Sequence, residues 1–186
     1  DLERMGGFAR YKDVDGDGIG WRTLPGTLHR LHAYLARGTG HNERAVYSER
    51  PDDWEKNMER LGRKFETARA MVPEPEVDLL EDAKIGLIGF GSSDPAIREA
   101  RHRLSQSGIE TSYLRVRALP MNEVVREFLA AHERAYVIEL NTDGQLAKLI
   151  QMEFPGLATR VVSLAHSDGM PLSARWITSA VQQQER

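Results

Sequence analysis

The chain has 186 residues, of which 40% are hydrophobic and 28% charged, as is usual for a globular protein with a buried core. Its formal net charge of -3 is slight, so we expect neither nucleic acid nor an anionic membrane as a partner. The absence of cysteine excludes disulfides, thiolate zinc sites and cysteine-ligated iron–sulfur clusters on this chain.

Targeting signals are not evident in the sequence. No apolar run approaches the roughly 20 residues of a membrane-spanning helix, and no signal-peptide pattern opens the chain. We therefore expect a cytoplasmic protein. The chain starts at Asp1 and not at Met, and we expect further sequence upstream.

The N-terminal part, 1–83, is predicted to be an extension followed by one helix. Residues 1–50 are rich in glycine and show no strand alternation, so they need another surface to lie on. A helix is predicted over 52–72, because apolar residues recur at alternating spacings of four and three, in Trp54, Met58, Leu61, Phe65, Ala68 and Val72. We expect this apolar face to pack against a neighbour, either the docked extension or a second copy in a self-associated dimer. Residues 73–83 are expected to be a linker.

From residue 84 the pattern changes to alternating strands and helices. Strands are predicted at 84–90, 109–116, 135–140 and 160–164, and helices at 95–107, 121–131, 142–152 and from 173 onward. Asp94 is the expected N-cap of the first of these helices. Such alternation predicts a three-layer α/β domain with a mostly parallel sheet over 84–186.

The stretch DVDGDGIGWRTL at 13–24 matches the first half of a calcium-binding EF-hand loop. Asp13, Asp15 and Asp17 stand where oxygen ligands are needed, but the twelfth position is Leu24, which cannot bind a cation. We interpret the stretch as a solvated turn. A calcium-dependent interaction module that uses the three aspartates is the alternative.

Gly16, Asp17 and Gly18, with Asn42 downstream, also match the signature that holds thiamine diphosphate through magnesium. That site needs a buried strand before the aspartate and a helix N-terminus after it. The sequence before Gly16 is too polar for such a strand, and glycine and proline follow where the helix should start. We therefore assign no metal or cofactor to these residues.

The turn GFGSSD at 89–94 resembles the opening of a dinucleotide-binding fingerprint. Its third glycine is replaced by Asp94, whose carboxylate would repel a pyrophosphate. We predict a tight strand-to-helix turn, and a free-standing nucleotide-binding or regulatory domain is the alternative. Ser163, His166 and Asp168 are sequence neighbours, which is not how a catalytic triad is usually assembled. No catalytic residue is assigned.

Several stretches together resemble one family, the alpha subunits of 2-oxoacid:ferredoxin oxidoreductases, and the 2-oxoglutarate type fits best. The similar stretches are RYKDVDGDGIGWRTLPGT, ARGTGHNE, NMERLGRKFETARAMVP, LIGFGSSDPAIREA, YVIELNTDGQLAKLI and DGMPLSARWI. They occur in the family's order and cover nearly the whole chain. The resemblance implies that 84–186 is a transketolase C-terminal-like domain within the C-terminal part of such a subunit.

The resemblance also implies where the chemistry lies. In this family, thiamine diphosphate, magnesium and the iron–sulfur cluster belong to a partner beta subunit, and a Tyr-Pro-Ile-Thr-Pro motif of the alpha subunit approaches the 2-oxoacid. This sequence has no such motif. The family reaction converts a 2-oxoacid and coenzyme A into an acyl-coenzyme A, and electrons leave to ferredoxin. We expect this chain to be inactive alone and to serve assembly with the beta subunit.

Two groups of polar residues are the candidate contact sites. Arg22, His41 and Asn42 are expected at the rim of the active-site cleft, because His41 and Asn42 belong to the glycine-flanked loop GTGHNE at 38–43. Asn141, Gly144 and Gln145 are expected at a subunit interface, because they follow a predicted strand at the edge where α/β sheets place ligands and partners.

Overall fold

The computed structural model describes residues 7–28 and 38–186. Two compact units divide the chain, Asp1–Met71 and Val72–Arg186. Among the described helices, none is both long enough and apolar enough to cross a membrane.

The first unit is built on helix α1 (Pro51–Met71). Pro51 suits the first turn of a helix, and Asp52 and Asp53 beside it favour the positive end of the helix dipole. The helix predicted over 52–72 is therefore confirmed within one residue at each end. In the described parts of residues 7–50, the only strand-like pairing is an isolated bridge between His41 and Tyr47.

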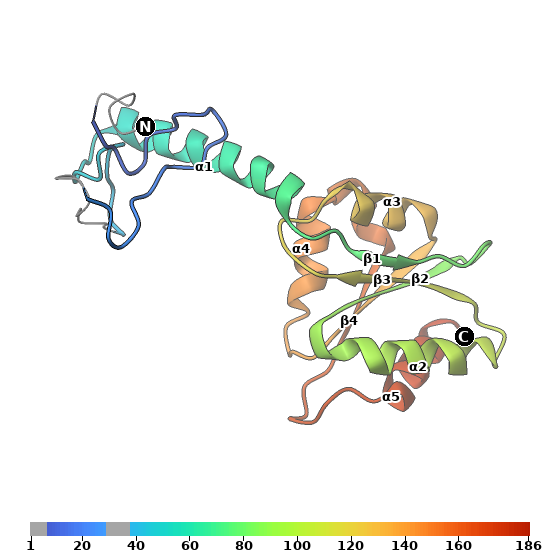
Figure 1. Ribbon diagram of the computed structural model, residues 1–186. Coiled ribbons are helices and arrows are strands. Elements are labelled where there is room, and N and C mark those ends of the chain that lie inside the picture. Colours follow the sequence, from blue (N-terminus) through green and yellow to red (C-terminus); the bar gives the residue numbers. More distant parts are fainter. Residues whose placement is uncertain (1–6, 29–37) are drawn as a thin grey trace. The chain divides into compact units, whose positions relative to one another are not determined.

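The glycine-rich segment 7–28 lies beside α1 and is held there by polar contacts (Figure 1). Arg60 Nη1 donates to the Gly18 carbonyl oxygen at 2.9 Å, and Thr67 Oγ1 donates to the Asp17 carbonyl oxygen at 2.6 Å. A Cβ added to Gly18 would lie 2.2 Å from the backbone nitrogen of Lys64, and Gly18 has a φ of +79°. Only glycine meets both conditions, so the extension docks on the helix through a backbone-to-backbone approach.

The apolar face of α1 is a different surface from the one that the extension covers. Trp54 is 58% exposed, Phe65 57% and Met58 39%, whereas Arg60 is buried. Docking of the extension on α1, one of the two expected arrangements, is observed, but the extension contacts the polar face of the helix. The described part of the extension leaves the apolar face exposed, because Gly18 needs close access to the helix backbone beside Arg60 and Lys64, and packing of that face against a second copy stays a prediction.

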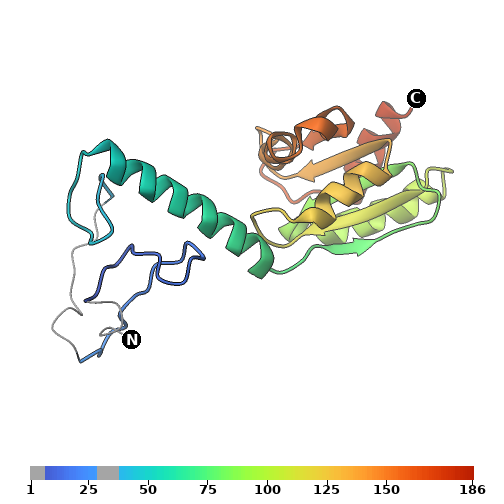
Figure 2. The same cartoon turned by 90° about the horizontal axis from the view of Figure 1, so that it is seen from above.

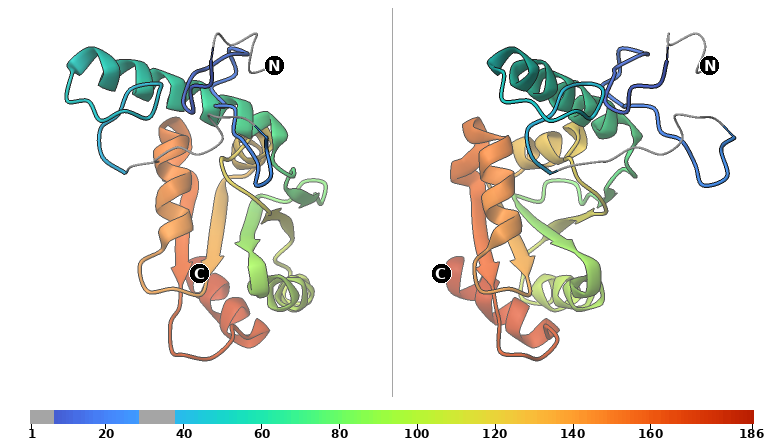
Figure 3. Two further views of the ribbon diagram at one scale, coloured as in Figure 1. Left: turned by 60° about the vertical axis from the view of Figure 1, so that its left-hand side comes forward. Right: turned by 90° about the vertical axis from the view of Figure 1, so that its left-hand side faces the viewer.

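The second unit contains a five-stranded sheet in the order β1-β3-β2-β4-β5. Strands β2, β3, β4 and β5 are parallel, and β1 is antiparallel to β3. The arrowheads of β2 (green), β4 and β5 (orange) point the same way in Figure 3. The strand bounds are β1 Glu76–Asp78, β2 Ile85–Phe90, β3 Thr111–Val116, β4 Arg134–Glu139 and β5 Val161–Ala165.

Helices cover both faces of this sheet (Figures 1 and 2). Their bounds are α2 Asp94–Ser105, α3 Glu123–Ala131, α4 Gln145–Glu153 and α5 Ala174–Gln184, with short 3-10 helices at Gly91–Ser93 and Pro155–Arg160. Leu87 belongs to the core formed with α2 and α5, and its neighbour Ile88 to the core formed with α3 and α4. The central strands are therefore apolar on both faces, as parallel strands require. The predicted three-layer, mostly parallel α/β fold is confirmed.

Two local expectations differ from the structure. The segment 73–83, expected to be a linker, contributes the edge strand β1, in which Val77 pairs with Leu114. Its three residues are all exposed, so they lack the apolar pattern that reveals a buried strand. Asp94 is not the N-cap of α2: Ser93 holds that position without a side-chain cap, and Asp94 is the first helical residue.

Candidate functional site

A crevice of about 420 Å³ opens at the carboxyl ends of the strands in the second unit. The chain leaves β2 into α2 on one face of the sheet and leaves β4 into α4 on the other, so the connections diverge there. Open α/β sheets bind ligands and partners at such a point. The wall is largely apolar and includes Phe90, Leu119 and Leu149, whose side chains are 41%, 52% and 44% exposed.

Glu139, the last residue of β4, is fully buried at the base of this crevice. Its Oε2 accepts hydrogen bonds from the Leu146 N–H at 2.8 Å and from Asn141 Nδ2 at 2.7 Å, and its Oε1 accepts from the Ala147 N–H at 3.1 Å. The carboxylate thus satisfies two N–H groups that have no partner inside α4, and the helix dipole stabilises its charge. The N-terminus of α4 already holds an anion that belongs to the chain.

The predicted interface residues form the turn between β4 and α4. Asn141 Oδ1 accepts from the N–H groups of Asp143 at 3.1 Å and Gly144 at 2.8 Å. Gly144 has a φ of +61°, and a Cβ there would lie 2.5 Å from Ser163 Oγ on β5. Asn141 and Gln145 both line the crevice, while Gly144 is buried. The structure brings these residues together; their contact with a partner stays a prediction.

The GFGSSD turn is a structural turn between β2 and α2. Gly91 has a φ of +57°, and Ser93 Oγ donates to the Phe90 carbonyl oxygen at 2.6 Å. Asp94 Oδ1 accepts from Arg98 Nε at 3.0 Å and from the Tyr113 hydroxyl at 3.0 Å. A pyrophosphate at this helix N-terminus would therefore meet a carboxylate, which does not favour the nucleotide-binding alternative.

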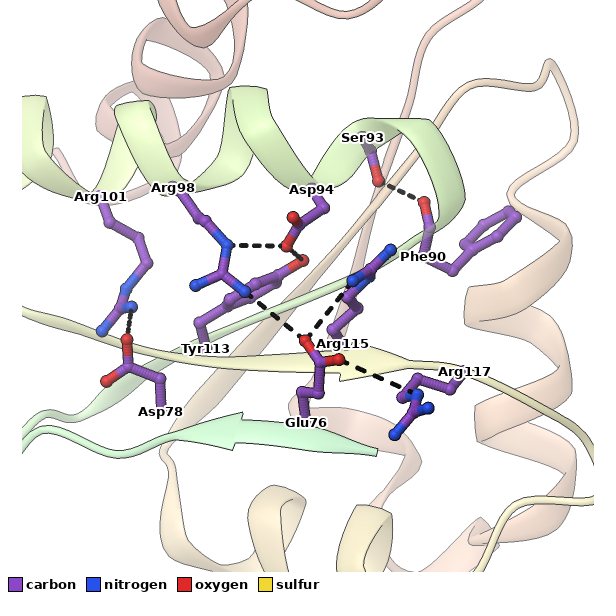
Figure 4. Close-up of polar contacts among 10 residues, drawn as sticks. All are labelled: Glu76, Asp78, Phe90, Ser93, Asp94, Arg98, Arg101, Tyr113, Arg115 and Arg117. Atoms are coloured by element: carbon purple, nitrogen blue, oxygen red, sulfur yellow. Dashed lines mark hydrogen bonds and ion pairs between the residues drawn. The ribbon is translucent and has the colours of Figure 1, made fainter. Parts of the chain in front are cut away.

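An arginine-rich cluster lies beside this turn (Figure 4). The Glu76 carboxylate of β1 stands 3.4 Å from Arg115 Nη1, 3.6 Å from Arg98 Nη2 and 3.9 Å from Arg117 Nε. All four side chains are a third to a half exposed, so each pair contributes little to stability by itself. Their collective effect is to hold the short edge strand and to place charge along an otherwise open sheet edge.

Neighbouring side chains show how burial and charge act on this cluster. Burial, and then the hydrogen bond to the Asp94 carboxylate, raise the pKa of the Tyr113 phenol. The hydrogen bond from Arg101 holds the pKa of the Asp78 carboxyl below its usual value of 3.8. Near neutral pH, Tyr113 therefore keeps its proton and donates to Asp94, and Asp78 is ionised and accepts from Arg101.

The DVDGDG stretch of the first unit is a hydrogen-bonded turn. Asp13 Oδ1 accepts from the Gly18 N–H at 2.9 Å, Asp17 Oδ1 accepts from the Ile19 N–H at 2.8 Å, and Asp15 Oδ2 accepts from Trp21 Nε1 at 2.5 Å. The three carboxylates each hold a donor of the chain. Within residues 7–28 and 38–186, no group of three or more His, Cys, Asp or Glu side chains is arranged to hold a metal ion.

The same turn does not fit a magnesium–diphosphate site. The Asp17 and Gly18 carbonyl oxygens accept from side chains of α1, and the Asp17 carboxylate accepts from the Ile19 N–H. The two carbonyl oxygens hold the extension on the helix, and the Asp17 carboxylate stabilises the turn itself.

The predicted rim residues lie in the first unit, but only two of them come together. The His41 ring stacks on Tyr11 with ring centroids 4.0 Å apart. Asn42 Oδ1 accepts from the N–H groups of Arg44 at 3.0 Å and Val46 at 3.2 Å, and so shapes a tight turn. Arg22 is exposed and is not part of the hollow that Asn42 lines.

Sequence reasoning did not single out Glu139, Glu76 or Arg60. The apolar run YVIE ends in Glu139 directly before a turn, and a carboxylate at the end of an apolar strand is a sequence signal for a buried polar role. Glu76 lies in a segment without apolar alternation. Nothing in the sequence marks Arg60 as buried, because it stands on the charged side of an amphipathic helix.

The chain thus combines a three-layer α/β unit, with a crevice at the carboxyl ends of its parallel strands, and a loop-on-helix unit. No protein-family model matches the chain. It is 31% identical over 149 residues to the alpha subunit of 2-oxoacid:ferredoxin oxidoreductase 2 of Aeropyrum pernix, covering 77% of this chain and 22% of that protein. It is 35% identical over 104 residues to the alpha subunit of oxidoreductase 1 of the same organism, covering 51% and 16%.

A solved structure shares the fold. The 2-oxoglutarate:ferredoxin oxidoreductase of Magnetococcus marinus, with 2-oxoglutarate, coenzyme A and succinyl-CoA bound, matches 96% of this chain and 31% of its own chain, with a TM-score of 0.75 and 23% identity. The chain belongs to the family of 2-oxoacid:ferredoxin oxidoreductase alpha subunits, and it spans about a fifth of the curated relatives it matches.

Proposed function

We propose that this chain is part of the alpha subunit of an enzyme that oxidatively decarboxylates a 2-oxoacid, 2-oxoglutarate being the expected one, to an acyl-coenzyme A and passes the electrons to ferredoxin. The observation that carries the proposal is the identity of 31% to such an alpha subunit across 77% of the chain. The structure of the Magnetococcus marinus enzyme contains 2-oxoglutarate, coenzyme A and succinyl-CoA, and this supports 2-oxoglutarate as the expected substrate.

Within that enzyme, this part serves assembly rather than catalysis. The N-terminus of α4 lies at the crevice and is capped by Glu139, and α2 begins with Asp94, so neither helix offers a free positive end to a cofactor phosphate. The apolar crevice wall and the exposed Trp54 and Phe65 on α1 are the kind of surface that another protein covers. The inferred occupants are the neighbouring parts of the same complex, among them a beta subunit.

The cofactors of the parent complex are inferred to lie outside this chain. Thiamine diphosphate, magnesium and an iron–sulfur cluster are assigned to the beta subunit, and coenzyme A is the acyl acceptor. The chain has no cysteine to bind a cluster, and its Gly16-Asp17-Gly18 turn does not fit magnesium and diphosphate. We infer a cytoplasmic complex.

The test starts from the parent polypeptide in its source cells, captured with an antibody raised against this chain. The expected result is a polypeptide several times larger than 21.0 kDa that co-purifies with a thiamine-binding, cysteine-bearing subunit. The purified complex should reduce ferredoxin only when both a 2-oxoacid and coenzyme A are present. A polypeptide of 21.0 kDa without such a partner and without this activity would refute the proposal.

The assembly role is tested on the same complex with the double variant Trp54→Glu, Phe65→Glu. Charges on this exposed face should weaken subunit association without unfolding α1, because both side chains are more than half exposed. Glu59→Lys, at another exposed position of α1, is the matched control and should leave the complex intact. Full association and full activity of the double variant would count against a contact at this face.

A further inference from the structure

A second hollow, of about 450 Å³, lies entirely within the first unit. Its walls come from α1, from residues 11–13 and from the turn at 42–44. Among the residues that the structure describes, five cationic side chains line it, against the three carboxylates of Asp13, Glu43 and Asp53. The cations are Lys12, Arg44, Lys56, Arg60 and Arg63.

Two of the three carboxylates are already engaged. Asp13 Oδ2 pairs with Arg63 Nε at 3.0 Å while its Oδ1 accepts from the Gly18 N–H, and Asp53 Oδ2 accepts from Ser48 Oγ at 2.6 Å. Burial by itself would raise the pKa of Asp13, but the Gly18 hydrogen bond and Arg63 hold it below its usual value of 3.8. Asp13 therefore stays ionised near neutral pH and matches the charge of Arg63.

The other cations have less compensation. Among the described residues, no carboxylate lies within ion-pairing distance of Lys12, Arg44 or Lys56. Lys12 is half-buried, and Arg44 and Lys56 are exposed at the mouth of the hollow. Cations that line one concave surface raise the local concentration of anions there.

Arg60 is the buried member of this set, with 8% of its surface exposed. Its Nη1 donates to the Gly18 carbonyl oxygen at 2.9 Å and its Nη2 to Asn57 Oδ1 at 3.0 Å, both neutral acceptors. Its Nε is buried without a hydrogen-bond partner in the described part of the chain. A buried guanidinium without a direct counter-ion is costly, and an oxyanion close by would lower that cost.

The aromatic side chain of Tyr11 forms another part of the wall of the hollow. The Arg60 guanidinium carbon lies 5.6 Å from the centroid of this ring, and the His41 ring stacks on it at 4.0 Å. Stacking restricts the orientation of Arg60, so part of the entropy cost of binding is already met before a ligand arrives.

We propose that this hollow binds a small multivalent oxyanion, a phosphate group or a dicarboxylate, with Lys12, Arg44 and Lys56 at its mouth and Arg60 at its base. Guanidinium and ammonium groups recognise both classes through charge-assisted hydrogen bonds. The site goes beyond the proposed function and does not depend on it, because it rests only on residues of the first unit.

The test is a titration of the full chain with inorganic phosphate and, in a separate arm, with succinate, each at constant ionic strength against chloride. Amide and arginine Nε–H resonances of isotope-labelled protein report the binding. Saturable shifts at Arg60, Asn42 and Tyr11 are expected in at least one arm. Phosphate alone identifies a phosphate site, succinate alone a carboxylate site, and both together a general oxyanion site.

Variants test whether the residues that line the hollow bind the anion. Lys56→Gln and Arg44→Gln change exposed side chains, and each should weaken binding about tenfold. Lys64→Gln removes the same charge from the same helix at an exposed position that does not line the hollow, and it should leave the affinity unchanged. No saturable shift in either arm, or equal weakening by Lys56→Gln and Lys64→Gln, would overturn the proposal.

Discussion

Replacing Gly18 by alanine should release the glycine-rich extension from α1. The new Cβ would lie 2.2 Å from the Lys64 nitrogen and 2.6 Å from the Arg60 carbonyl oxygen, and both are helix backbone atoms that cannot move aside. The turn must retreat, and the hydrogen bonds from Arg60 to the Gly18 carbonyl and from Thr67 to the Asp17 carbonyl are lost.

The loss of docking free energy in Gly18→Ala can be compared with that in a matched control, Gly16→Ala. Gly16 has a φ of +78°, nearly that of Gly18, but nothing lies within 4 Å of its added Cβ. Both variants carry the left-handed backbone penalty of about 1–2 kcal/mol. Gly18→Ala also loses two hydrogen bonds worth about 1 kcal/mol each. The docked state should therefore be weaker by about 3–4 kcal/mol in Gly18→Ala and by about 1–2 kcal/mol in Gly16→Ala.

Hydrogen exchange on the full chain measures this difference. Peptides covering residues 11–21 contain the Gly18 and Ile19 amides, which donate to Asp13 and Asp17 in the docked turn. A difference of about 2 kcal/mol corresponds to roughly thirtyfold faster exchange in Gly18→Ala than in Gly16→Ala. Equal exchange in the two variants would refute the claim that close backbone approach holds the extension on α1. The exchange of the α/β unit serves as the internal reference.

Three further predictions concern the α/β unit. Glu139→Gln should lower the free energy of unfolding by about 2–4 kcal/mol in chemical denaturation, because an amide group would face two helix N–H donors; no loss would contradict the capping role. Gly86→Ala should cost about 1–3 kcal/mol in the same assay, since its Cβ would lie 2.5 Å from the Phe128 ring, and a neutral result would mean that the ring is free to shift. Tyr113 has a pKa raised above 10.0, so its contribution to stability is complete below pH 10.0 and is lost as pH rises further. Tyr113→Phe should leave the phenolate absorbance at about pH 11 unchanged, and a drop would show that Tyr113 ionises normally.

The α/β fold is predictable from the sequence because its signals are local. The strand KIGLIGF and the helix after Asp94 are marked by an apolar run, a turn and helical periodicity, and all lie within about 20 residues of one another. Parallel strands covered on both faces must be apolar throughout, so β2 and β4 are readable from composition alone. The exposed β1 lacks that pattern, and its pairing with β3 depends on residues more than 30 positions away.

The candidate sites were less predictable because their roles depend on long-range contacts. Asn141 and Gly144 were correctly placed at the carboxyl edge of the sheet, but the acceptor that organises their turn and caps α4 is Glu139. Arg22, His41 and Asn42 are expected at one rim, and only the last two share a surface with Tyr11. Arg60 acquires its burial from a loop 42 residues earlier in the chain.

The sequence by itself determined the α/β class, the long helix and the likeness to oxidoreductase alpha subunits, because each depends on residue type and local spacing. Only the tertiary structure decided which face of α1 the extension covers. The apolar stripe predicted burial of Trp54 and Phe65, yet the extension carries a glycine that fits against the helix backbone and carbonyl groups that accept from Arg60 and Thr67. Periodicity reports where apolar side chains lie, whereas backbone approach and hydrogen-bond geometry select the surface that is buried.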